Sequence, residues 1–252
     1  MIIYALYNLK GGVGKTTSCV NLAYLAAKEG KRTLVWDLDP QGAASFYLRA
    51  NQEVNGEIGR ALEGTEQLID KVESTAYNNL YLLKSGLQNR VLDIKLGSLE
   101  KSKKRLKIAL SSLKAHFDFI FIDCPPTISM LAENIFKSVH FVLFPLIPTP
   151  LSERSYWQVV RFFEAHGHDA RKIVPFFTLV DRRKNIHKAT ISAFRESKRK
   201  LLRTIIPQSA VFERMGLQQA PVHAFSPYSK PSMSYRNLWQ ELKMMRKLKK
   251  LR

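Results

Sequence analysis

The chain has 252 residues, of which 45% are hydrophobic and 24% charged, and these values are close to those of soluble globular domains. This composition excludes an intrinsically disordered chain, a collagen-like repeat and a coiled-coil rod. The charge is less ordinary, because 40 Lys and Arg residues against 21 Asp and Glu residues give a net charge of +19.

Short apolar runs alternate with longer helical patterns along the chain. We expect strands at 2–8, 33–37, 117–123, 140–147 and 173–180, with weaker candidates at 80–83 and 205–206. Helices are expected at 16–29, 92–114, 152–166 and 186–202, followed by a closing basic helix and tail over about 236–252. Continuous apolar strands separated by helices predict an α/β fold, a mostly parallel twisted sheet with helices on both faces. No Gly, Ser or Pro-rich linker divides the chain, so we expect residues 1–252 to form one domain.

The sequence shows no targeting or metal-binding pattern. Residues 1–7 lack a basic segment and a small-residue cleavage site, so a signal peptide is not expected. The apolar stretch 138–152 is 15 residues long and too short to span a bilayer. Cys19 and Cys124 stand far apart without a CxxC pattern, which argues against a disulfide scaffold, a zinc site or an iron–sulfur cluster. We therefore expect a cytoplasmic protein with two core cysteines.

The strongest motif is the segment 10–17, KGGVGKTT, which follows a predicted strand and opens a predicted helix. Glycines let backbone N–H groups approach phosphate oxygens closely, and a helix N-terminus adds positive potential. Lys15 is expected to reach the β- and γ-phosphates, and the Thr16 hydroxyl to ligate Mg²⁺. Leu9 stands where the common GxxxxGK[ST] pattern has its first glycine, so the loop is unusual. The predicted nucleotide-binding residues of this loop are Gly11, Gly12, Val13, Gly14, Lys15, Thr16 and Thr17.

This unusual loop resembles the deviant Walker A loop of the ParA/MinD family of ATPases. Residues 37–42, DLDPQG, resemble the family's second acidic motif, and residues 119–126, FIFIDCPP, resemble its Walker B strand. Weaker similarity continues through 181–183, 206–207 and 235–242, so the resemblance covers nearly the whole chain. It is greatest to the short, Soj-like ParA members. It implies a P-loop NTPase fold, ATP and Mg²⁺ as cofactors, and slow ATP hydrolysis that a partner stimulates.

The resemblance also implies roles for single residues. Lys10 corresponds to the family's signature lysine, which crosses a dimer interface and stabilises the phosphoryl group transferred in the partner subunit. Asp39 is expected to position the attacking water. Asp37 and Asp123 are expected to join Thr16 at the Mg²⁺ site, with Asp123 acting through water.

Adenine recognition is assigned to two further residues. Asp181 follows a predicted strand, where the family places a polar residue that contacts the base. Pro207 is placed to pack on the adenine ring. An ordinary loop explains both residues equally well.

Basic residues concentrate in the second part of the chain, since residues 151–252 hold 22 basic and 7 acidic side chains. An excess of this kind indicates a polyanionic partner, and phosphate contacts give sequence-independent, salt-sensitive DNA binding. No helix-turn-helix precedes the loop, which is similar to the short ParA members that bind DNA non-specifically as ATP-bound dimers. The candidate DNA-binding residues are Arg182, Arg183, Lys188, Arg195, Lys198, Arg199, Lys200, Arg203, Lys247, Lys249 and Lys250.

These patterns together predict an ATP-dependent dimerising switch that associates with DNA in the nucleoid. It is expected to segregate or position DNA or a protein cargo with a ParB-like partner or cargo adaptor. The cargo stays open among chromosome, plasmid, carboxysome and chemoreceptor cluster. The segment 206–222 departs from the pattern expected for DNA segregation and slightly favours a protein cargo.

Three alternatives remain beside this hypothesis. Leu238, Leu242, Met245 and Leu248 recur at helical spacing among basic residues, so the tail also fits a membrane-surface helix of the kind that MinD-type relatives use. A metabolic ATP-dependent ligase or synthetase on the same scaffold is less favoured, because no substrate-binding constellation is found. The basic residues also fit a simple solvated surface.

Overall fold

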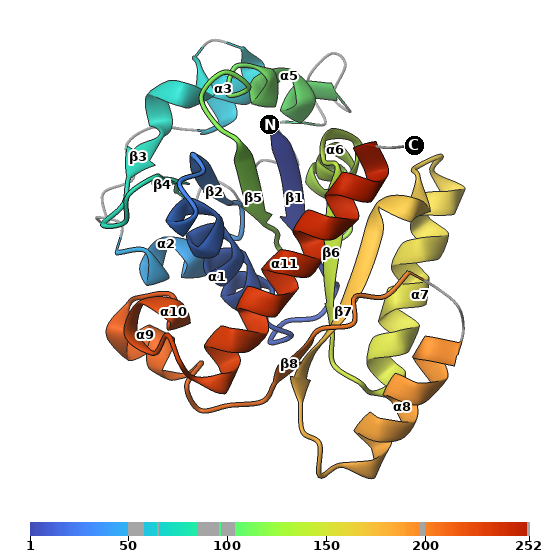
Figure 1. Cartoon of the computed structure of the whole chain (residues 1–252). Helices are drawn as coiled ribbons and strands as arrows, with labels where there is room; N and C mark the ends of the chain where they lie inside the picture. Colours follow the sequence, from blue (N-terminus) through green and yellow to red (C-terminus); the bar gives the residue numbers. More distant parts are fainter. Residues whose placement is uncertain (50–57, 65, 85–95, 97–103, 197–199, 251–252) are drawn as a thin grey trace.

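The computed structural model describes residues 1–49, 58–64, 66–84, 96, 104–196 and 200–250. Within these residues, eight strands form one sheet in the order β3-β4-β2-β5-β1-β6-β7-β8 (Figure 1). All neighbouring strands are parallel except β3 and β4, which confirms the mostly parallel α/β sheet. The strands are β1 (Ile2–Leu6), β2 (Thr33–Asp37), β3 (Glu73–Ser74), β4 (Leu80–Leu83), β5 (Phe119–Asp123), β6 (Phe141–Leu146), β7 (Ile173–Val180) and β8 (Ile205–Pro207).

Helices cover both faces of the sheet (Figure 1). One face carries α1 (Lys15–Lys28), α2 (Ala43–Tyr47), α9 (Arg214–Gln218), α10 (Val222–Phe225) and α11 (Lys230–Lys250). The other carries α3 (Ile58–Glu63), α5 (Arg105–Ser111), α6 (Met130–Ser138), α7 (Pro150–Ala165) and α8 (Asn185–Glu196). Two 3-10 turns, η1 (Leu68–Lys71) and η4 (Ala170–Lys172), complete the described elements.

Strand β1 is apolar throughout because both of its faces are buried. Ile3 and Ala5 are buried in the core on one face of the sheet, while Tyr4 and Leu6 are buried in the core on the other. Successive side chains of a strand point to opposite faces, so a sheet covered on both sides needs continuous apolar strands. This arrangement places the loop after β1 at the middle of the sheet's carboxyl edge, the usual ligand-binding edge of α/β proteins.

Two predicted helices differ from the structure. The helix predicted over 186–202 ends at Glu196, and residues 200–202 are not helical, because the Leu202 N–H donates to the Pro175 carbonyl oxygen at 3.0 Å. That bond draws the chain along β7 toward β8. The helix predicted over 92–114 is observed as α5 and turns at 112–114, while 92–95 and 97–103 lie outside the described residues. Helix α6 was not predicted, although Ser129 caps it by accepting the Ala132 N–H at 3.4 Å.

Helix α11 lies across α1 and is part of the core (Figure 1). The Tyr235 and Ser18 hydroxyls are hydrogen bonded at 2.9 Å. The Trp239 ring packs edge-on against Phe119, with 5.2 Å between ring centroids, and Leu242 is fully buried. The apolar face of α11 is therefore occupied as far as Leu242. In the described part of the chain, no helix is both long and apolar enough to cross a membrane.

Candidate nucleotide-binding site

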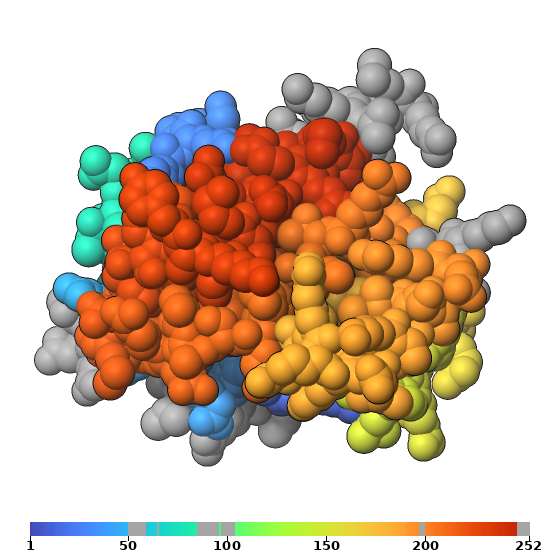
Figure 2. All heavy atoms as spheres, turned by 60° about the horizontal axis from the view of Figure 1, so that its bottom comes forward, coloured from blue at the N-terminus to red at the C-terminus, as the bar shows by residue number. Residues whose placement is uncertain are grey.

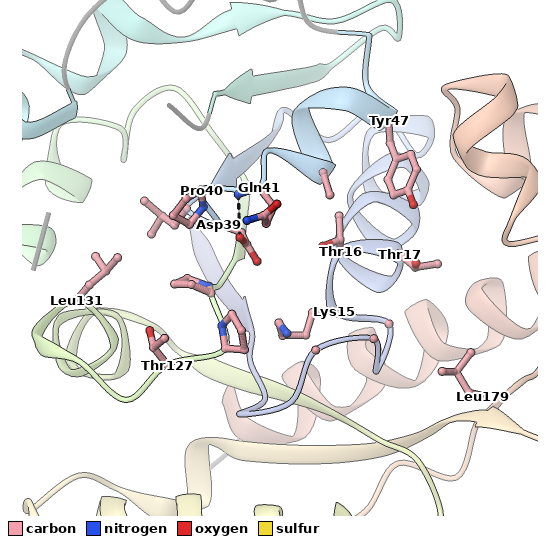
Figure 3. Close-up of a pocket in the computed structure, with 17 residues that line it drawn as sticks. Lys15, Thr16, Thr17, Asp39, Pro40, Gln41, Tyr47, Thr127, Leu131 and Leu179 are labelled. Atoms are coloured by element: carbon pink, nitrogen blue, oxygen red, sulfur yellow. Dashed lines mark hydrogen bonds between the residues drawn. The ribbon is translucent and has the colours of Figure 1, made fainter. Parts of the chain in front are cut away.

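A cavity of about 700 Å³ opens at the carboxyl ends of β1, β2 and β5. Figure 3 shows Lys15 and Asp39 pointing into it, from the start of α1 and the loop after β2. Tyr47 and Thr127 add hydroxyl groups to its wall, although sequence reasoning had not named them. The other lining residues are Gly11, Gly12, Gly14, Thr16, Thr17, Leu38, Pro40, Gln41, Ala43, Pro125, Pro126, Leu131 and Leu179.

The loop after β1 needs glycine for its shape. Gly12 and Gly14 have φ angles of 70° and 86°, in the left-handed region that residues with a Cβ rarely adopt. A Cβ atom on Gly14 would also lie 3.2 Å from the Thr178 hydroxyl oxygen. Val13 is buried between these glycines and anchors the loop to the core. Helix α1 begins directly afterwards at Lys15, so its N-terminal N–H groups face the cavity where phosphates would lie.

The Lys15 side chain turns back across this loop. Its Nζ donates to the Lys10 carbonyl oxygen at 2.9 Å. Burial lowers the pKa of Lys15, while the charges of Asp123 and Asp39 oppose that shift. The ammonium group is thus held inside the loop, where it is available to phosphate oxygens.

Asn8 positions the start of the loop. The side chain is fully buried, and its Oδ1 accepts hydrogen bonds from the Lys10 N–H at 3.0 Å and the Ser155 hydroxyl at 3.5 Å. Its Nδ2 donates to the Pro145 carbonyl oxygen at 2.8 Å. Asn8 therefore ties the loop to β6 and α7. Sequence reasoning missed it, and the only local signal is a polar side chain at the end of an apolar strand.

Two buried carboxylates lie side by side beneath the cavity. Asp37 and Asp123 end β2 and β5 and are register partners, and both are fully buried. The Thr16 hydroxyl donates to Oδ2 of Asp123 at 2.6 Å. The Ser45 N–H and hydroxyl donate to Oδ2 of Asp37 at 2.9 and 2.7 Å. Burial raises the pKa of Asp37 to about 6 and that of Asp123 well above its usual range, to which the charge of Asp37 also contributes.

These residues fit a Mg²⁺ ion. Oδ1 of Asp37 and Oδ1 of Asp123 are buried without a hydrogen-bond partner, and a hydroxyl oxygen lies beside them. Oxygen donors are the ligands that Mg²⁺ prefers, and a double positive charge would offset the repulsion between the carboxylates. Within the described residues, no three acidic, His or Cys side chains form a complete cage. Mg²⁺ usually takes its remaining ligands from water and substrate phosphates.

Asp181 and Pro207 line a separate cavity of about 460 Å³ next to the first one. The Arg183 guanidinium donates to both Asp181 carboxylate oxygens, at 3.0 and 2.9 Å, and lowers the pKa of this carboxyl to about 2. Leu179, with a φ of 52°, has an unusual backbone conformation and lines the P-loop cavity. The end of β7 therefore lines the first cavity, and the turn that follows it lines the second.

Those predicted DNA-binding residues whose side chains the structure describes lie on α8 or close to it in the chain. Figure 2 shows α8 in amber beside the orange-red segment that ends in α11. Within the described chain, Arg182, Arg183, Lys188, Arg195, Lys200 and Arg203 are exposed. Lys198 and Arg199 lie outside the described residues, as do the side chains of Lys247, Lys249 and Lys250. Arg183 is ion-paired with Asp181 at 2.9 Å, which reduces the positive charge that Arg183 can offer to a phosphate.

The parallel sheet, the glycine loop that opens α1 and the two carboxylates at its edge define a P-loop nucleotide-binding protein. A family model described as an AAA domain matches residues 1–173. The Bacillus subtilis sporulation initiation inhibitor protein Soj is 30% identical over 246 residues, which cover 95% of this chain and 97% of that protein. The chain therefore belongs to the ParA/MinD family of ATPases and is close to its Soj-like ParA members.

Solved structures share the whole fold. A putative plasmid partition protein from Borrelia burgdorferi bound to AMPPNP has a TM-score of 0.85 at 21% identity, over 97% of this chain and 99% of that chain. The cobyrinic acid a,c-diamide synthase of Mycobacterium smegmatis, with bound ADP and magnesium, has a TM-score of 0.82 at 24% identity. The match covers 100% of this chain and 97% of that chain. Both of these solved structures contain a bound nucleotide, AMPPNP in the first and ADP with magnesium in the second.

Proposed function

We propose that the protein is a switch that binds ATP, dimerises, and associates with DNA until hydrolysis releases it. The observation that carries this proposal is the pair of lysines in one loop. Lys15 Nζ is already bound inside the loop, while the Lys10 ammonium makes no hydrogen bond with a described residue. One lysine therefore serves the nucleotide of its own subunit, and the other is available to a second subunit.

The residues divide the hydrolysis chemistry between them. The loop N–H groups and Lys15 bind the β- and γ-phosphates, and Lys10 of the partner adds positive charge as the phosphoryl group leaves. Asp123, Asp37 and Thr16 would hold Mg²⁺, which would neutralise negative charge on the phosphates. Asp39 points into the cavity and orients the attacking water. Asp181 and Pro207 hold the adenine in the adjoining cavity.

The exposed cations near α8 support DNA as the partner of the ATP-bound dimer. Arg182, Lys188 and Arg195 line one cavity beside α8, and contacts of such cations with phosphates release counterions from DNA whatever its sequence. A ParB-like partner or cargo adaptor then stimulates hydrolysis, and repeated binding and release position a chromosome, plasmid or protein cargo. The protein acts in the cytoplasm, on the nucleoid.

The packing of α11 weighs against membrane association as the main function. Leu238, Trp239 and Leu242 are buried against the sheet, so their apolar surface is not available to a bilayer. Met244 is exposed, and Met245 packs partly against the core. A membrane-surface helix would have to use the last turns of α11 alone or separate α11 from α1.

Asp39→Ala tests the proposal. Without the residue that orients water, the variant should remain an ATP-bound dimer and retain DNA, as measured by sedimentation and by gel shift with random-sequence duplex. Gln41→Ala, in the same loop, is the matched control and should hydrolyse ATP. If Asp39→Ala turns over ATP at the wild-type rate, or stays monomeric with ATP, the proposed switch is wrong.

A further inference from the structure

A third cavity, of about 390 Å³, lies between α8 and the edge of the sheet at β8. We call it the α8 pocket. Its size falls within the roughly 300–1,000 Å³ of small-molecule sites. It shares Val180, Arg182 and Ile205 with the neighbouring cavity of Asp181 and Pro207, but none of its residues belongs to the P-loop. The lining residues are Val180, Arg182, His187, Lys188, Ile191, Ser192, Arg195 and Ile205.

Cationic side chains dominate the wall of the α8 pocket. Arg182, Lys188 and Arg195 are exposed there, and Arg195 donates a 3.5 Å hydrogen bond to the Arg203 carbonyl oxygen. Two carboxylates adjoin the pocket, and both are engaged. Asp181 is paired with Arg183, and Glu196 accepts a hydrogen bond from the Ser192 hydroxyl at 3.4 Å. The pocket therefore favours an anionic group.

His187 adds a buried donor to the same pocket. It is only 3% exposed, and its Nδ1 accepts the Asp181 N–H at 3.1 Å. Because Nδ1 accepts this N–H, the ring carries its proton on Nε2, and burial and the charge of Lys184 lower the pKa of His187 while Asp181 opposes that shift. Nε2–H makes no hydrogen bond with a residue that the structure describes. A neutral donor at the base of a cationic pocket suits a phosphate oxygen.

The remaining walls are apolar. Val180, Ile191 and Ile205 offer methyl groups next to the cations, which suits a ligand with an anionic end and an apolar body. A sugar phosphate has this division, because its ring is largely apolar on its faces. We propose that the α8 pocket binds one nucleotide unit, with the phosphate on Arg182, Lys188 and Arg195 and the sugar against the isoleucines.

The proposed function uses the basic residues for DNA binding without a defined pocket, and the α8 pocket goes beyond it. The inference rests on the proposed function only if the bound nucleotide unit is part of DNA. Two sources supply the same chemistry, namely a link of a DNA backbone or a free mononucleotide. The His187 bond to the Asp181 N–H also joins the α8 pocket to the cavity assigned to adenine. Occupation of the pocket should therefore hold the turn after β7 in place and strengthen ATP binding.

Two matched variants test the site. Ile191→Glu puts a carboxylate on the pocket wall, whereas Ala193→Glu puts the same charge on the same helix outside the pocket, at an exposed position. Lys188→Gln removes one exposed cation without disturbing the core. It tests the pocket independently if Ile191→Glu fails to fold. The full chain, with Mg²⁺ and a non-hydrolysable ATP analogue at the P-loop, is titrated with random-sequence duplex DNA and separately with deoxythymidine monophosphate.

We expect Ile191→Glu and Lys188→Gln to weaken binding of at least one probe by about ten-fold or more, and Ala193→Glu to change it less than about two-fold. Loss for DNA alone identifies the backbone as the source, and loss for the monophosphate identifies a free nucleotide. If the wild type binds the monophosphate but no DNA, the site stands and the proposed DNA function fails. Equal losses in Ile191→Glu and Ala193→Glu, wild-type binding by both pocket variants, or binding of neither probe by the wild type would each overturn the inference.

Discussion

Replacing Asp37 by Asn should stabilise the protein in the absence of nucleotide. The pKa of Asp37 is raised from 3.8 to about 6 by burial, so the folded state is penalised at pH 7 for holding this group ionised. A difference of that size corresponds to about 3 kcal/mol. The pKa of about 6 already includes the two hydrogen bonds from Ser45, which favour the ionised form and which Asn retains as neutral hydrogen bonds. The expected gain at pH 7 is therefore about 3 kcal/mol.

The sign of the pH dependence follows from the raised pKa. Between pH 3.8 and about 6 the folded state holds a proton that the unfolded state has released, so wild-type stability falls as the pH rises through this window. The advantage of Asp37→Asn should therefore be largest at pH 7 and fall to about half of that value at pH 5.

Urea denaturation at pH 7 and pH 5, without nucleotide and with ATP and Mg²⁺, measures both effects. Bound ligand should stabilise the wild type more than Asp37→Asn, because the variant has lost a charge facing the metal site. Asp70→Asn on η1, an exposed position, is the control and should change little at either pH. A variant less stable than wild type at pH 7 without nucleotide, or an advantage that does not shrink at pH 5, would refute the electrostatic reasoning.

Four further substitutions address the loop after β1 and the start of α1. Lys15→Ala should weaken ATP binding by about 100-fold, since a charge-assisted contact of roughly 3 kcal/mol is lost, and calorimetry showing unchanged affinity would disprove it. Lys10→Ala should keep ATP affinity within about three-fold yet abolish ATP-dependent dimerisation in sedimentation experiments, and normal dimers would remove Lys10 from the mechanism. Gly14→Ala should destabilise the fold by about 1–3 kcal/mol in urea, because φ is 86° and Thr178 is close, whereas Gly11→Ala, with open space around it, should be nearly neutral.

The fold could be predicted largely because its signals are local. Strands β2 and β7 appear at the predicted residues, since each is a continuous apolar run that the sheet buries on both faces. The order of glycines, lysine and threonine in residues 10–17 likewise predicts a loop whose backbone faces a ligand. The helix predicted over 186–202 was too long, because the Leu202 N–H forms a hydrogen bond with the backbone of β7. The hydrophobic periodicity of the sequence does not reveal such a long-range bond.

The supporting residues of the site could not be predicted for a physical reason. Asn8 acts through Pro145 and Ser155, which lie 137 and 147 residues away in the chain. The raised pKa of Asp37 likewise depends on its burial, which exists only once β2 lies between β4 and β5 in the sheet. Such roles depend on contacts that form only in the folded sheet, and residues adjacent in the sequence do not reveal them.

Binding of random-sequence duplex DNA with ATP, with ADP and without nucleotide, over a salt series, tests the central claim most directly. We predict binding with ATP and Mg²⁺ only, with an affinity that falls at least about ten-fold between roughly 50 and 200 mM salt. Anionic vesicles measured in parallel should show little ATP-dependent binding, because the apolar face of α11 is buried. DNA binding that ignores the nucleotide, or ATP-dependent binding to vesicles without binding to DNA, would contradict the account.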